Sequence, residues 1–347
     1  MDMPLVSVIT VVYNGAATIE QTIQSVLNQS YKNIEYIIID GKSTDGTQKV
    51  IEQYKKSLAY FISEEDNGLY NAMNKGIKQA KGEIIGIVNS DDWYEQDAIA
   101  QIVRVFTSFP DIDILYGDMN LVDKKGNRKK YNQAPLCRLW HEMSVSHPAT
   151  FVKKEIYEKY GTFDETYQIA ADFDLMNLFY NKKLKFAHIG KVITNYRWGG
   201  VSTTNMTVCR AEVKRVRDKY FNLDAFGDIC YNKFFIPDLP LFIFGSGEWG
   251  GRIAPALKQK HALIYKYLDN DSSKWGTELE GIPISSPEIL KCNSGQVFVA
   301  IERYEEEIIE QLQRMNLENC HIIRLSDCLK EYEMFYHQSN GDCLEVD

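Results

Sequence analysis

The chain has 347 residues, of which 44% are hydrophobic and 25% are charged, and its formal net charge is −9. This length exceeds the usual domain of about 100–200 residues, so we expect two domains, and the composition is typical of a globular rather than a disordered protein. The acidic balance excludes broad nucleic-acid binding, which needs many phosphate contacts from Lys and Arg.

The seven cysteines are scattered, and no two have the CxxC spacing of a zinc or disulfide motif. Such cysteines indicate reduced thiols in the cytoplasm. The N-terminal residues lead directly into a predicted strand without the pattern of a signal peptide, and no run of about 20 apolar residues predicts a membrane span. We therefore expect a soluble cytoplasmic protein.

Predicted strands and helices alternate along the first hundred residues. Buried β-branched runs predict strands at 6–13, 34–39, 59–62 and 83–88, and helical spacing predicts helices at 18–28, 43–56, 67–80 and 95–106. This order predicts a doubly wound, mostly parallel sheet. Ligands of such sheets bind beyond the carboxyl ends of the strands, where the sequence places Tyr13, Asp40, residues 64–66 and Asp91-Asp92.

The rest of the chain predicts a second, smaller α/β domain. Strand-like stretches at 112–122, 147–152 and 186–196 and helices at 172–180 and 207–221 complete the first domain, and a new strand–helix rhythm begins at Leu241. We predict a first domain at 1–222, an irregular aromatic linker at 223–239, a Rossmann-like domain at 240–330 and a C-terminal tail at 331–347.

The adjacent carboxylates Asp91 and Asp92 directly follow a buried strand. They repel each other unless a cation lies between them, and Mg²⁺ or Mn²⁺ typically joins such carboxylates to substrate phosphates. A capped, solvated turn is the alternative for a pair of aspartates. Because the first domain has no glycine-rich phosphate loop, a nucleotide diphosphate at this rim would be held through the metal, which would also stabilise the departing diphosphate.

Three motifs in order resemble family-two glycosyltransferases of the GT-A fold. Residues 6–14 (VSVITVVYN) resemble their opening strand, residues 39–47 (IDGKSTDGT) are similar to their second-strand motif, and residues 68–92 resemble the segment that ends in their metal-binding DxD-type motif. A weaker likeness continues to about residue 204. The resemblance implies an inverting, metal-dependent transfer of a sugar from a nucleotide-diphosphate sugar, commonly a UDP-sugar.

The resemblance also implies roles for the matched positions. Val11 and Tyr13 would flank the nucleobase, and Asp40 would accept a hydrogen bond from it. Asp91 would contact the ribose or a metal-bound water, and Asp92 would bind the metal directly.

The same resemblance places Asp66 and Lys75 on the segment that lines the donor site. For Lys75, a solvated helix face is an equally good interpretation.

Inverting transfer needs a general base beside the acceptor hydroxyl. Members of the family place a carboxylate here, often in an E-D pair, and this chain has Ala-Ala-Asp-Phe-Asp at 170–174 without the preceding Glu. We predict Asp172 as the base and Asp174 as the second candidate. Alternatively, Asp174 is an exposed first-turn carboxylate that the helix dipole favours.

Two further segments are candidates for contacts with the acceptor or the sugar. His147 opens a predicted strand and resembles the His of an H-Q-A stretch in related sequences, where it would contact the acceptor or the metal. A hydrogen-bonded structural histidine is the alternative, and His188 is interpreted as structural. The loop at 198–202 would let Trp198 stack on a sugar face, although a simple turn also fits it.

The second domain opens with a GxGxxG motif, Gly245, Gly247 and Gly250, and Asp269 ends the following strand. This is the context of a dinucleotide or ribose site. The segment resembles the small Rossmann-like domain at the start of sialic-acid-type sugar acetyltransferases. Only about 90 residues are present and Pro255 interrupts the first helix, which argues against a full dehydrogenase. Ligand binding without chemistry and a purely structural role are favoured over NAD chemistry.

Together these patterns predict an enzyme of surface polysaccharide biosynthesis that uses a nucleotide-sugar donor and a saccharide or lipid-linked acceptor. A lipid-linked acceptor would bring it into transient contact with the inner membrane surface. A non-catalytic nucleotide-sugar-binding or scaffolding protein is the alternative from another class. A bifunctional redox enzyme that uses the second domain is a third interpretation.

Overall fold

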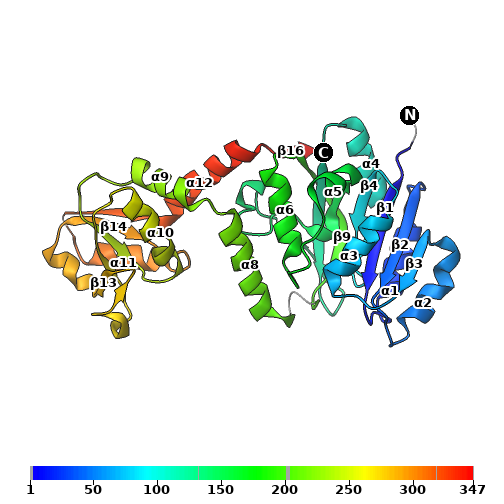
Figure 1. Ribbon diagram of the computed structural model, residues 1–347, viewed down its shortest axis with the longest axis horizontal. Helices are drawn as coiled ribbons and strands as arrows, with labels where there is room; N and C mark the ends of the chain where they lie inside the picture. Colours follow the sequence, from blue (N-terminus) through cyan, green and yellow to red (C-terminus); the bar gives the residue numbers. More distant parts are fainter. Residues whose placement is uncertain (1–2, 132, 201–203, 318, 347) are drawn as a thin grey trace. The chain divides into compact units, whose positions relative to one another are not determined.

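The computed structural model describes residues 3–131, 133–200, 204–317 and 319–346. The chain forms two compact units, Met1–Tyr220 with His337–Asp347 and Phe221–Tyr336, which are coloured along the sequence in Figure 1. Within the described ranges, no helix combines the length and the apolar character needed to cross a membrane.

The first part of unit one alternates strands and helices as the hydrophobic pattern predicts. Its elements are β1 (Val6–Val12), α1 (Ile19–Leu27), β2 (Ile34–Asp40), α2 (Thr47–Tyr54), η1 (Lys55–Ser57), β3 (Tyr60–Ser63), α3 (Leu69–Gln79), β4 (Ile84–Ile87), β5 (Trp93–Tyr94) and α4 (Ala98–Ser108). All residues of β1 and β4 are buried, which is why these strands read as continuous apolar runs.

The second part of unit one adds elements on the other side of β4. They are β6 (Ile114–Val122), β7 (Arg128–Tyr131), η2 (Leu136–Arg138), η3 (His147–Ala149), β8 (Thr150–Lys153), α5 (Lys154–Tyr160), α6 (Ala171–Asn181), β9 (Phe186–Arg197), α8 (Met206–Tyr220) and β16 (Leu344–Val346). His147 was predicted to open a strand, but it lies in the short 3₁₀ turn η3, and β8 begins at Thr150.

The strands of unit one form one mixed sheet in the order β16-β9-β6-β8-β4-β1-β2-β3, with β5 against β9 and β7 against β6. The β4–β1–β2–β3 half is parallel, and β8 runs antiparallel to both β4 and β6. This mostly parallel arrangement confirms the predicted fold class. The pairing of β8 was not predictable, because it joins segments about 65 residues apart in the sequence.

Helices cover both faces of the parallel half. One face of β1 packs with α1, α2 and α4 in a large apolar cluster. On the opposite face α3 lies very close to β1, since a Cβ on Gly76 would be 2.4 Å from the Cγ2 atom of Ile9. The carboxyl ends of β1, β2 and β4 are therefore left facing the loops that carry the predicted site residues.

Two boundaries differ from the prediction. The segment 223–239, predicted as an irregular linker, contains the helix α9 (Leu223–Lys233), whose Phe226 and Cys230 are buried. The tail predicted at 331–347 contains most of α12 (Leu325–Asn340) and the strand β16, which pairs in parallel with β9. The aromatic residues of the supposed linker contribute to the core of unit two. Composition alone does not distinguish an irregular aromatic linker from a packed aromatic helix.

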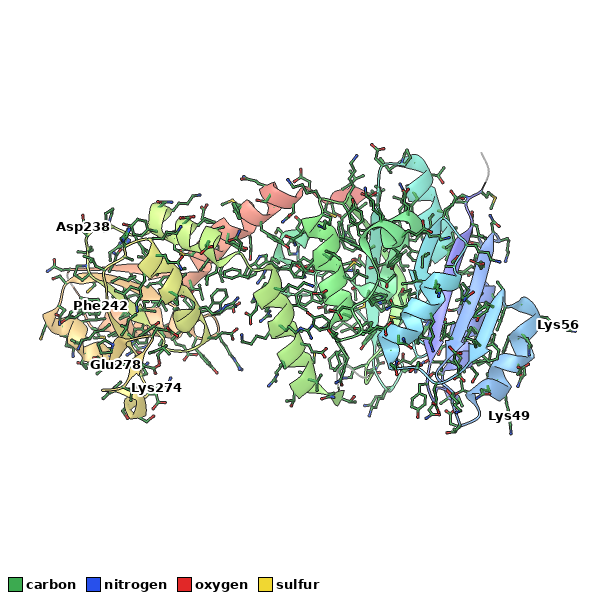
Figure 2. The ribbon with its side chains drawn as sticks, viewed as in Figure 1. Lys49, Lys56, Asp238, Phe242, Lys274 and Glu278 are labelled. Carbon is green, nitrogen blue, oxygen red and sulfur yellow. The ribbon has the colours of Figure 1, made fainter. Side chains whose placement is uncertain are left out.

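Unit two is a second α/β layer structure. Besides α9 and most of α12 it contains β10 (Leu241–Phe244), α10 (Glu248–Gln259), β11 (Ile264–Leu268), η4 (Ser272–Lys274), β12 (Glu278–Leu279), β13 (Ile282–Ser285), η5 (Pro287–Cys292), β14 (Gly295–Val299), α11 (Glu305–Arg314) and β15 (Cys320–Arg324). The sheet order is β12-β13-β11-β10-β14-β15. Figure 2 labels Phe242 on β10 and Lys274 in the turn that follows β11.

The glycine motif of unit two forms a tight turn between β10 and α10. Gly245 has φ +103°, a conformation that L side chains rarely adopt. A Cβ on Gly250 would lie 2.0 Å from the carbonyl oxygen of Gly245, whereas a Cβ on Gly247 would have no atom within 4 Å. Gly250 is therefore needed for the close approach of the helix to the turn, and Gly247 is not.

We expect Gly250→Ala to destabilise unit two by about 1–3 kcal/mol, because the added methyl group overpacks against backbone. Gly247→Ala is the matched control and should change the free energy of unfolding by less than about 0.5 kcal/mol. Calorimetry that resolves the unfolding of the two units measures both variants. Equal effects of the two substitutions would contradict this assignment.

Candidate functional site

Loops at the carboxyl ends of β1 and β3 bring two of the predicted donor-site positions, Tyr13 and Asp66, next to Gly41 in the loop after β2. A Cβ on Gly41 would lie 2.5 Å from Asp66 Oδ2 and 3.4 Å from Cδ2 of Tyr13, so Gly41 lies between these two side chains. The Tyr13 ring is 69% exposed, and Val11 is buried in β1 behind it. The arrangement leaves a flat aromatic face available beside a carboxylate.

Asp40 fixes the turn that follows β2. Its buried carboxylate accepts hydrogen bonds from the Ser43 backbone N–H (3.1 Å), the Ser43 hydroxyl (2.5 Å) and the Ser63 hydroxyl (2.5 Å). The Ser43 hydroxyl oxygen also accepts the backbone N–H of Asn14 at 2.7 Å. Asp40 thus ties the loops after β1, β2 and β3 together, and its contact with a nucleobase stays a prediction.

Lys75 lies on α3 and orders the acidic segment before that helix. Its ammonium group pairs with Glu64 Oε1 at 2.8 Å and donates to the carbonyl oxygen of Glu65 at 3.0 Å. Asp66 accepts the backbone N–H of Gly68 at 2.9 Å. Neither of the two earlier interpretations of Lys75 included this ion pair, which the sequence could not specify.

The two aspartates after β4 have different surroundings. Asp92 is 0% exposed and its Oδ1 accepts the backbone N–H of Arg197 at 3.0 Å. Asp91 is partly exposed, and a Cβ on Gly200 would lie 3.6 Å from its Oδ2. Burial raises the pKa of both carboxyls, and the charge of Asp91 raises that of Asp92 further.

Arg197, at the end of β9, supplies the positive charge beside this pair. Its Nε donates to the carbonyl oxygen of Asp91 at 3.2 Å, and its guanidinium group lies 5.1 Å from the centre of the Trp93 ring. Its charge opposes the rise in pKa of Asp91 and Asp92. Sequence reasoning missed Arg197, because the pairing of β5 with β9 that brings it here joins residues about 100 positions apart.

The oxygen atoms around this pair suit a hard divalent cation. Asn89 Nδ2 lies 3.5 Å from Asp92 Oδ2, while Asn89 Oδ1 is buried without a hydrogen-bond partner. Two mutually repelling carboxylates and a spare amide oxygen are the ligand types that Mg²⁺ and Mn²⁺ prefer. Across the described ranges, no three His, Cys, Asp or Glu side chains are grouped closely enough to form a metal cage by themselves.

Asp172, the predicted base, lies in the first turn of α6. Its Oδ1 accepts the backbone N–H of Phe173 (2.8 Å) and the hydroxyl of Tyr70 (3.2 Å). Burial raises the pKa of Asp172, and the charge of His147 opposes that rise. Burial lowers the pKa of His147, and the charge of Asp172 opposes that fall.

An aromatic residue links the groups around Asp172. The ring of Phe163 stacks on Tyr70 with centroids 5.3 Å apart and meets His147 edge-on at 5.4 Å. The structure therefore brings His147 and Asp172, which were predicted independently, into one cluster with Tyr70. Tyr70 carries no sequence signal of its own, since an aromatic residue in the first turn of a helix is usually part of the core.

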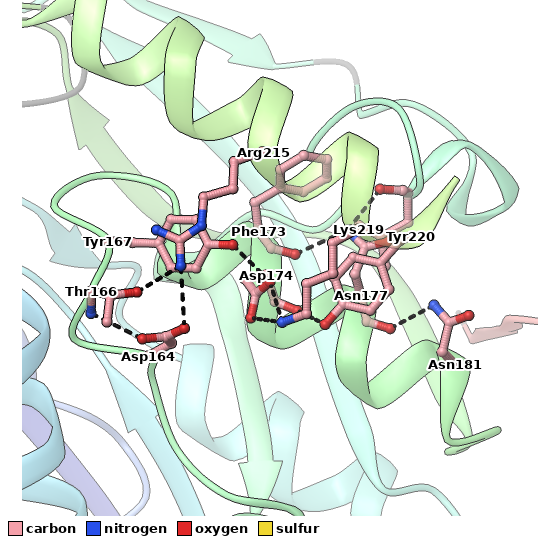
Figure 3. A network of polar contacts seen from close by, with 11 residues as sticks. Asp164, Thr166, Tyr167, Phe173, Asp174, Asn177, Asn181, Arg215, Lys219 and Tyr220 are labelled. Atoms are coloured by element: carbon pink, nitrogen blue, oxygen red, sulfur yellow. Dashed lines mark hydrogen bonds and ion pairs between the residues drawn. The ribbon is translucent and has the colours of Figure 1, made fainter. Parts of the chain in front are cut away.

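Asp174, the second candidate for the base, is buried, so the alternative of an exposed first-turn carboxylate is wrong. Its oxygen atoms accept from the Lys219 ammonium group at 2.8 and 2.9 Å and from the Tyr167 hydroxyl at 3.2 Å, as Figure 3 shows. With both oxygens bound inside the protein, Asp174 joins α6 to α8. The sequence could not reveal this pair, because Lys219 follows 45 residues later.

Trp198 is 55% exposed in the turn after β9, and its backbone N–H donates to the carbonyl oxygen of Val122 at 2.9 Å. Gly200 lies beside Asp91, as described above, so the start of the predicted sugar-binding loop borders the acidic pair. Val201 and Ser202, which complete that loop, lie outside the described residues.

In unit two the predicted ribose ligand Asp269 is bound by its own chain. Its Oδ2 accepts from the Ser246 hydroxyl at 2.5 Å and pairs with Lys274 at 2.9 Å. Burial tends to raise the pKa of this carboxyl, but the bonds from Ser246 and Lys274 outweigh it and lower the pKa. Asp269 thus fixes the turn of Gly245 and Gly247, and a ligand of this turn stays a prediction.

Residues 7–182, just over half of the chain, match the family model described as glycosyl transferase family 2. The chain belongs to this family. Residues 240–323 match a model described as C2185-like, N-terminal, and the predicted likeness of this region to sugar acetyltransferases stays a prediction.

Relatives support the same family. An uncharacterized glycosyltransferase of Rickettsia typhi is 31% identical over 223 residues, which are 60% of this chain and 69% of that protein. A PGL/p-HBAD biosynthesis glycosyltransferase of Mycobacterium bovis is 27% identical over 210 residues, which are 59% of this chain and 81% of that protein. The crystal structure of S. aureus TarS 1-349 in complex with UDP-GlcNAc has a TM-score of 0.51 and 18% identity, and the match covers 75% of this chain and 73% of that one. Unit one therefore has the GT-A fold.

We expect Asp92→Asn to raise the stability of unit one at pH 7. Burial raises the pKa of Asp92 in the folded state, so proton binding by Asp92 stabilises the fold. This contribution to stability is complete below the unfolded pKa of about 3.9 and is lost as the pH rises through the folded pKa. Asn can still accept the Arg197 N–H without this penalty. The melting temperature of the variant should therefore be higher than that of the wild type at pH 7, and the difference should shrink toward pH 4.

Asp174→Asn is the matched control, because it removes a charge of equal burial whose partner is a cation. We expect it to destabilise unit one by about 1–3 kcal/mol, since Lys219 loses its partner. Thermal scans at pH 4 and pH 7 compare the two variants. Destabilisation by both at pH 7 would contradict the electrostatic description of the acidic pair.

Proposed function

We propose that this glycosyltransferase transfers a sugar from a nucleotide-diphosphate sugar, with a UDP-sugar as the first candidate, to a saccharide or lipid-linked acceptor, with inversion at the anomeric carbon. The observation that carries the proposal is a pair of carboxylates directly after β4 together with a carboxylate of raised proton affinity in the first turn of α6. Asp91 and Asp92 suit a metal and a diphosphate, and Asp172 suits a proton acceptor.

The nucleotide of the donor would bind at the ends of β1 and β2. The exposed Tyr13 ring offers a face for the base, and Asp66 across Gly41 offers an acceptor for a base or ribose donor. The TarS structure that shares this fold contains UDP-GlcNAc, which supports a sugar nucleotide as the ligand class. Asp40 would support this site indirectly, because it holds the loops after β1, β2 and β3 in place.

Burial leads us to assign the metal to Asp91 rather than to Asp92, for which the family resemblance implied it. Asp91, which is partly exposed and borders Gly200, would bind the metal, while the buried Asp92 would hold the end of β9 through the Arg197 N–H. Asn89, whose amide nitrogen lies 3.5 Å from Asp92 Oδ2 and whose Oδ1 has no hydrogen-bond partner, would be a further oxygen ligand. A bound Mg²⁺ or Mn²⁺ would supply Lewis-acid stabilisation of the departing diphosphate.

Asp172 would act as the general base. It takes the proton of the acceptor hydroxyl while that oxygen forms a bond to the anomeric carbon, and the bond from that carbon to the diphosphate breaks with its electron pair leaving on the diphosphate. Attack from the face opposite the diphosphate inverts the configuration. The Tyr70 hydroxyl holds one oxygen of Asp172 and leaves the other for the acceptor.

The acceptor is proposed only as a class. The mycobacterial relative is named for PGL/p-HBAD biosynthesis, which supports a biosynthetic role in glycoconjugate or surface polysaccharide assembly. A lipid-linked acceptor would require the enzyme to work from the cytoplasm at the inner membrane surface.

A thermal-stability panel of UDP-, GDP-, dTDP- and CMP-sugars, with and without Mn²⁺, tests the donor site. A donor at about 100 times its dissociation constant should stabilise unit one by roughly 2.7 kcal/mol. We expect one carrier to act in a Mn²⁺-dependent way, and Asp91→Asn to abolish that effect. The absence of a response to every sugar nucleotide would overturn the proposal.

We expect Asp172→Asn to lower kcat by about 10²–10⁴-fold with little change in the stabilisation by donor. In the wild type the rate should fall with decreasing pH at a point above the usual Asp pKa of about 3.9, since the base must be ionised and burial raises the pKa of Asp172. Nucleotide release measures the rate, and NMR of the product measures the anomeric configuration. A retained configuration or an active Asp172→Asn would contradict the assigned mechanism.

A further inference from the structure

Helix α8 presents one face to the segment that carries the proposed base. Glu212, Arg215 and Lys219 are spaced by three and four residues and therefore share a face. Arg215 donates to the Thr166 hydroxyl at 2.8 Å and its guanidinium group lies 4.0 Å from the centre of the Tyr167 ring. Lys219 pairs with Asp174 (Figure 3).

Glu212 makes the densest of these contacts. Its Oε1 accepts the backbone N–H of Gln168 at 2.8 Å, and its Oε2 accepts those of Ile169 at 2.8 Å and Ala170 at 3.0 Å. Ala170 precedes the first residue of α6 and has no side chain that could cap the helix. A single carboxylate 42–44 residues away therefore satisfies three N–H groups at the helix start, where negative charge is also favoured by the helix dipole.

The opposite side of the same segment is held by Tyr70. The Tyr70 hydroxyl donates to the Ile169 carbonyl oxygen and lies 3.2 Å from Asp172 Oδ1. Asp172 is only two residues beyond the last N–H that Glu212 binds. One turn before Glu212, the thiol of Cys209 has its pKa raised by burial and by the charges of Asp172 and Glu212, so this face of α8 borders the base.

We propose that Glu212 is a positioning residue for the transfer reaction, which acts by fixing the backbone at 168–170 and through it the carboxylate of Asp172. The expected effect on the reaction rests on the proposed function, in which Asp172 is the general base. The positioning role has no counterpart in the sequence motifs, because Glu212 lies on a charged amphipathic helix that reads as a solvated surface. A displacement of the base by about 1 Å costs on the order of 10²-fold in rate, and three lost backbone hydrogen bonds permit a movement of that size.

The test compares Glu212→Ala and Glu212→Gln with Asp218→Asn in the full chain. Asp218 is a carboxylate of the same helix whose surface pair is Lys214 at 2.6 Å, so its substitution removes the same charge without touching residues 168–170. We expect Glu212→Ala to lower kcat by about 10²-fold with the donor KM changed less than about twofold. Glu212→Gln, which keeps one acceptor oxygen, should lose less activity, and Asp218→Asn should match the wild type.

Two further measurements separate positioning from a general loss of stability. Hydrogen–deuterium exchange of peptides that cover 168–170 should become faster in Glu212→Ala and not in Asp218→Asn. The acid limb of the pH–rate profile should move to lower pH, because a loosened segment admits water to Asp172 and relieves the burial that raises its pKa.

Wild-type kcat in Glu212→Ala, or unchanged exchange at 168–170, would overturn the proposal. If the wild-type protein transfers no sugar from any donor, the proposed function fails. Exchange at 168–170 then decides by itself whether Glu212 holds the segment.

Discussion

The burial of ionisable carboxylates after β4 and at the start of α6 is the constraint on which the site depends. Asp91, Asp92 and Asp172 all have raised pKa values because burial disfavours their ionised forms. A buried ionised carboxylate is unfavourable for folding unless positive charges and hydrogen-bond donors nearby stabilise its ionised form. Arg197 supplies both at the acidic pair, and Tyr70 with the Phe173 N–H supplies donors at Asp172.

These partners come from elements that lie far away in the sequence. Arg197 ends β9, which the sheet places next to β5, and Tyr70 begins α3, which packs against β1 through the close contact at Gly76. The site is therefore assembled by strand pairing and helix packing rather than by any local motif. The same holds for α8, whose side chains reach back to residues 164–174 and connect the start of α6 to the rest of unit one. This surrounding framework is what holds carboxylates of raised proton affinity inside the folded protein.

Prediction succeeded where a physical signal is local. Apolar runs identified the strands β1 to β4, and the position of polar residues just after them located Tyr13, Asp40, Asp66 and Asp91 at one edge of the sheet. It failed where two states share a composition, since the aromatic segment after residue 222 reads as a linker but forms α9 with buried Phe226. For Asp174, only the ion pair with Lys219 excludes the alternative of an exposed helix-start carboxylate.

The sequence by itself determined the alternation of strands and helices, the family likeness of the first hundred residues and the residue types available for chemistry. These follow from hydrophobic periodicity and from turn residues, which act over a few positions in the chain. Only the tertiary structure decided that Asp92 is buried while Asp91 is accessible, that His147 and Tyr70 lie next to Asp172, and that Glu212 holds the segment before α6. Burial and hydrogen-bond partners depend on contacts between residues as much as about 100 positions apart, and no local pattern specifies them.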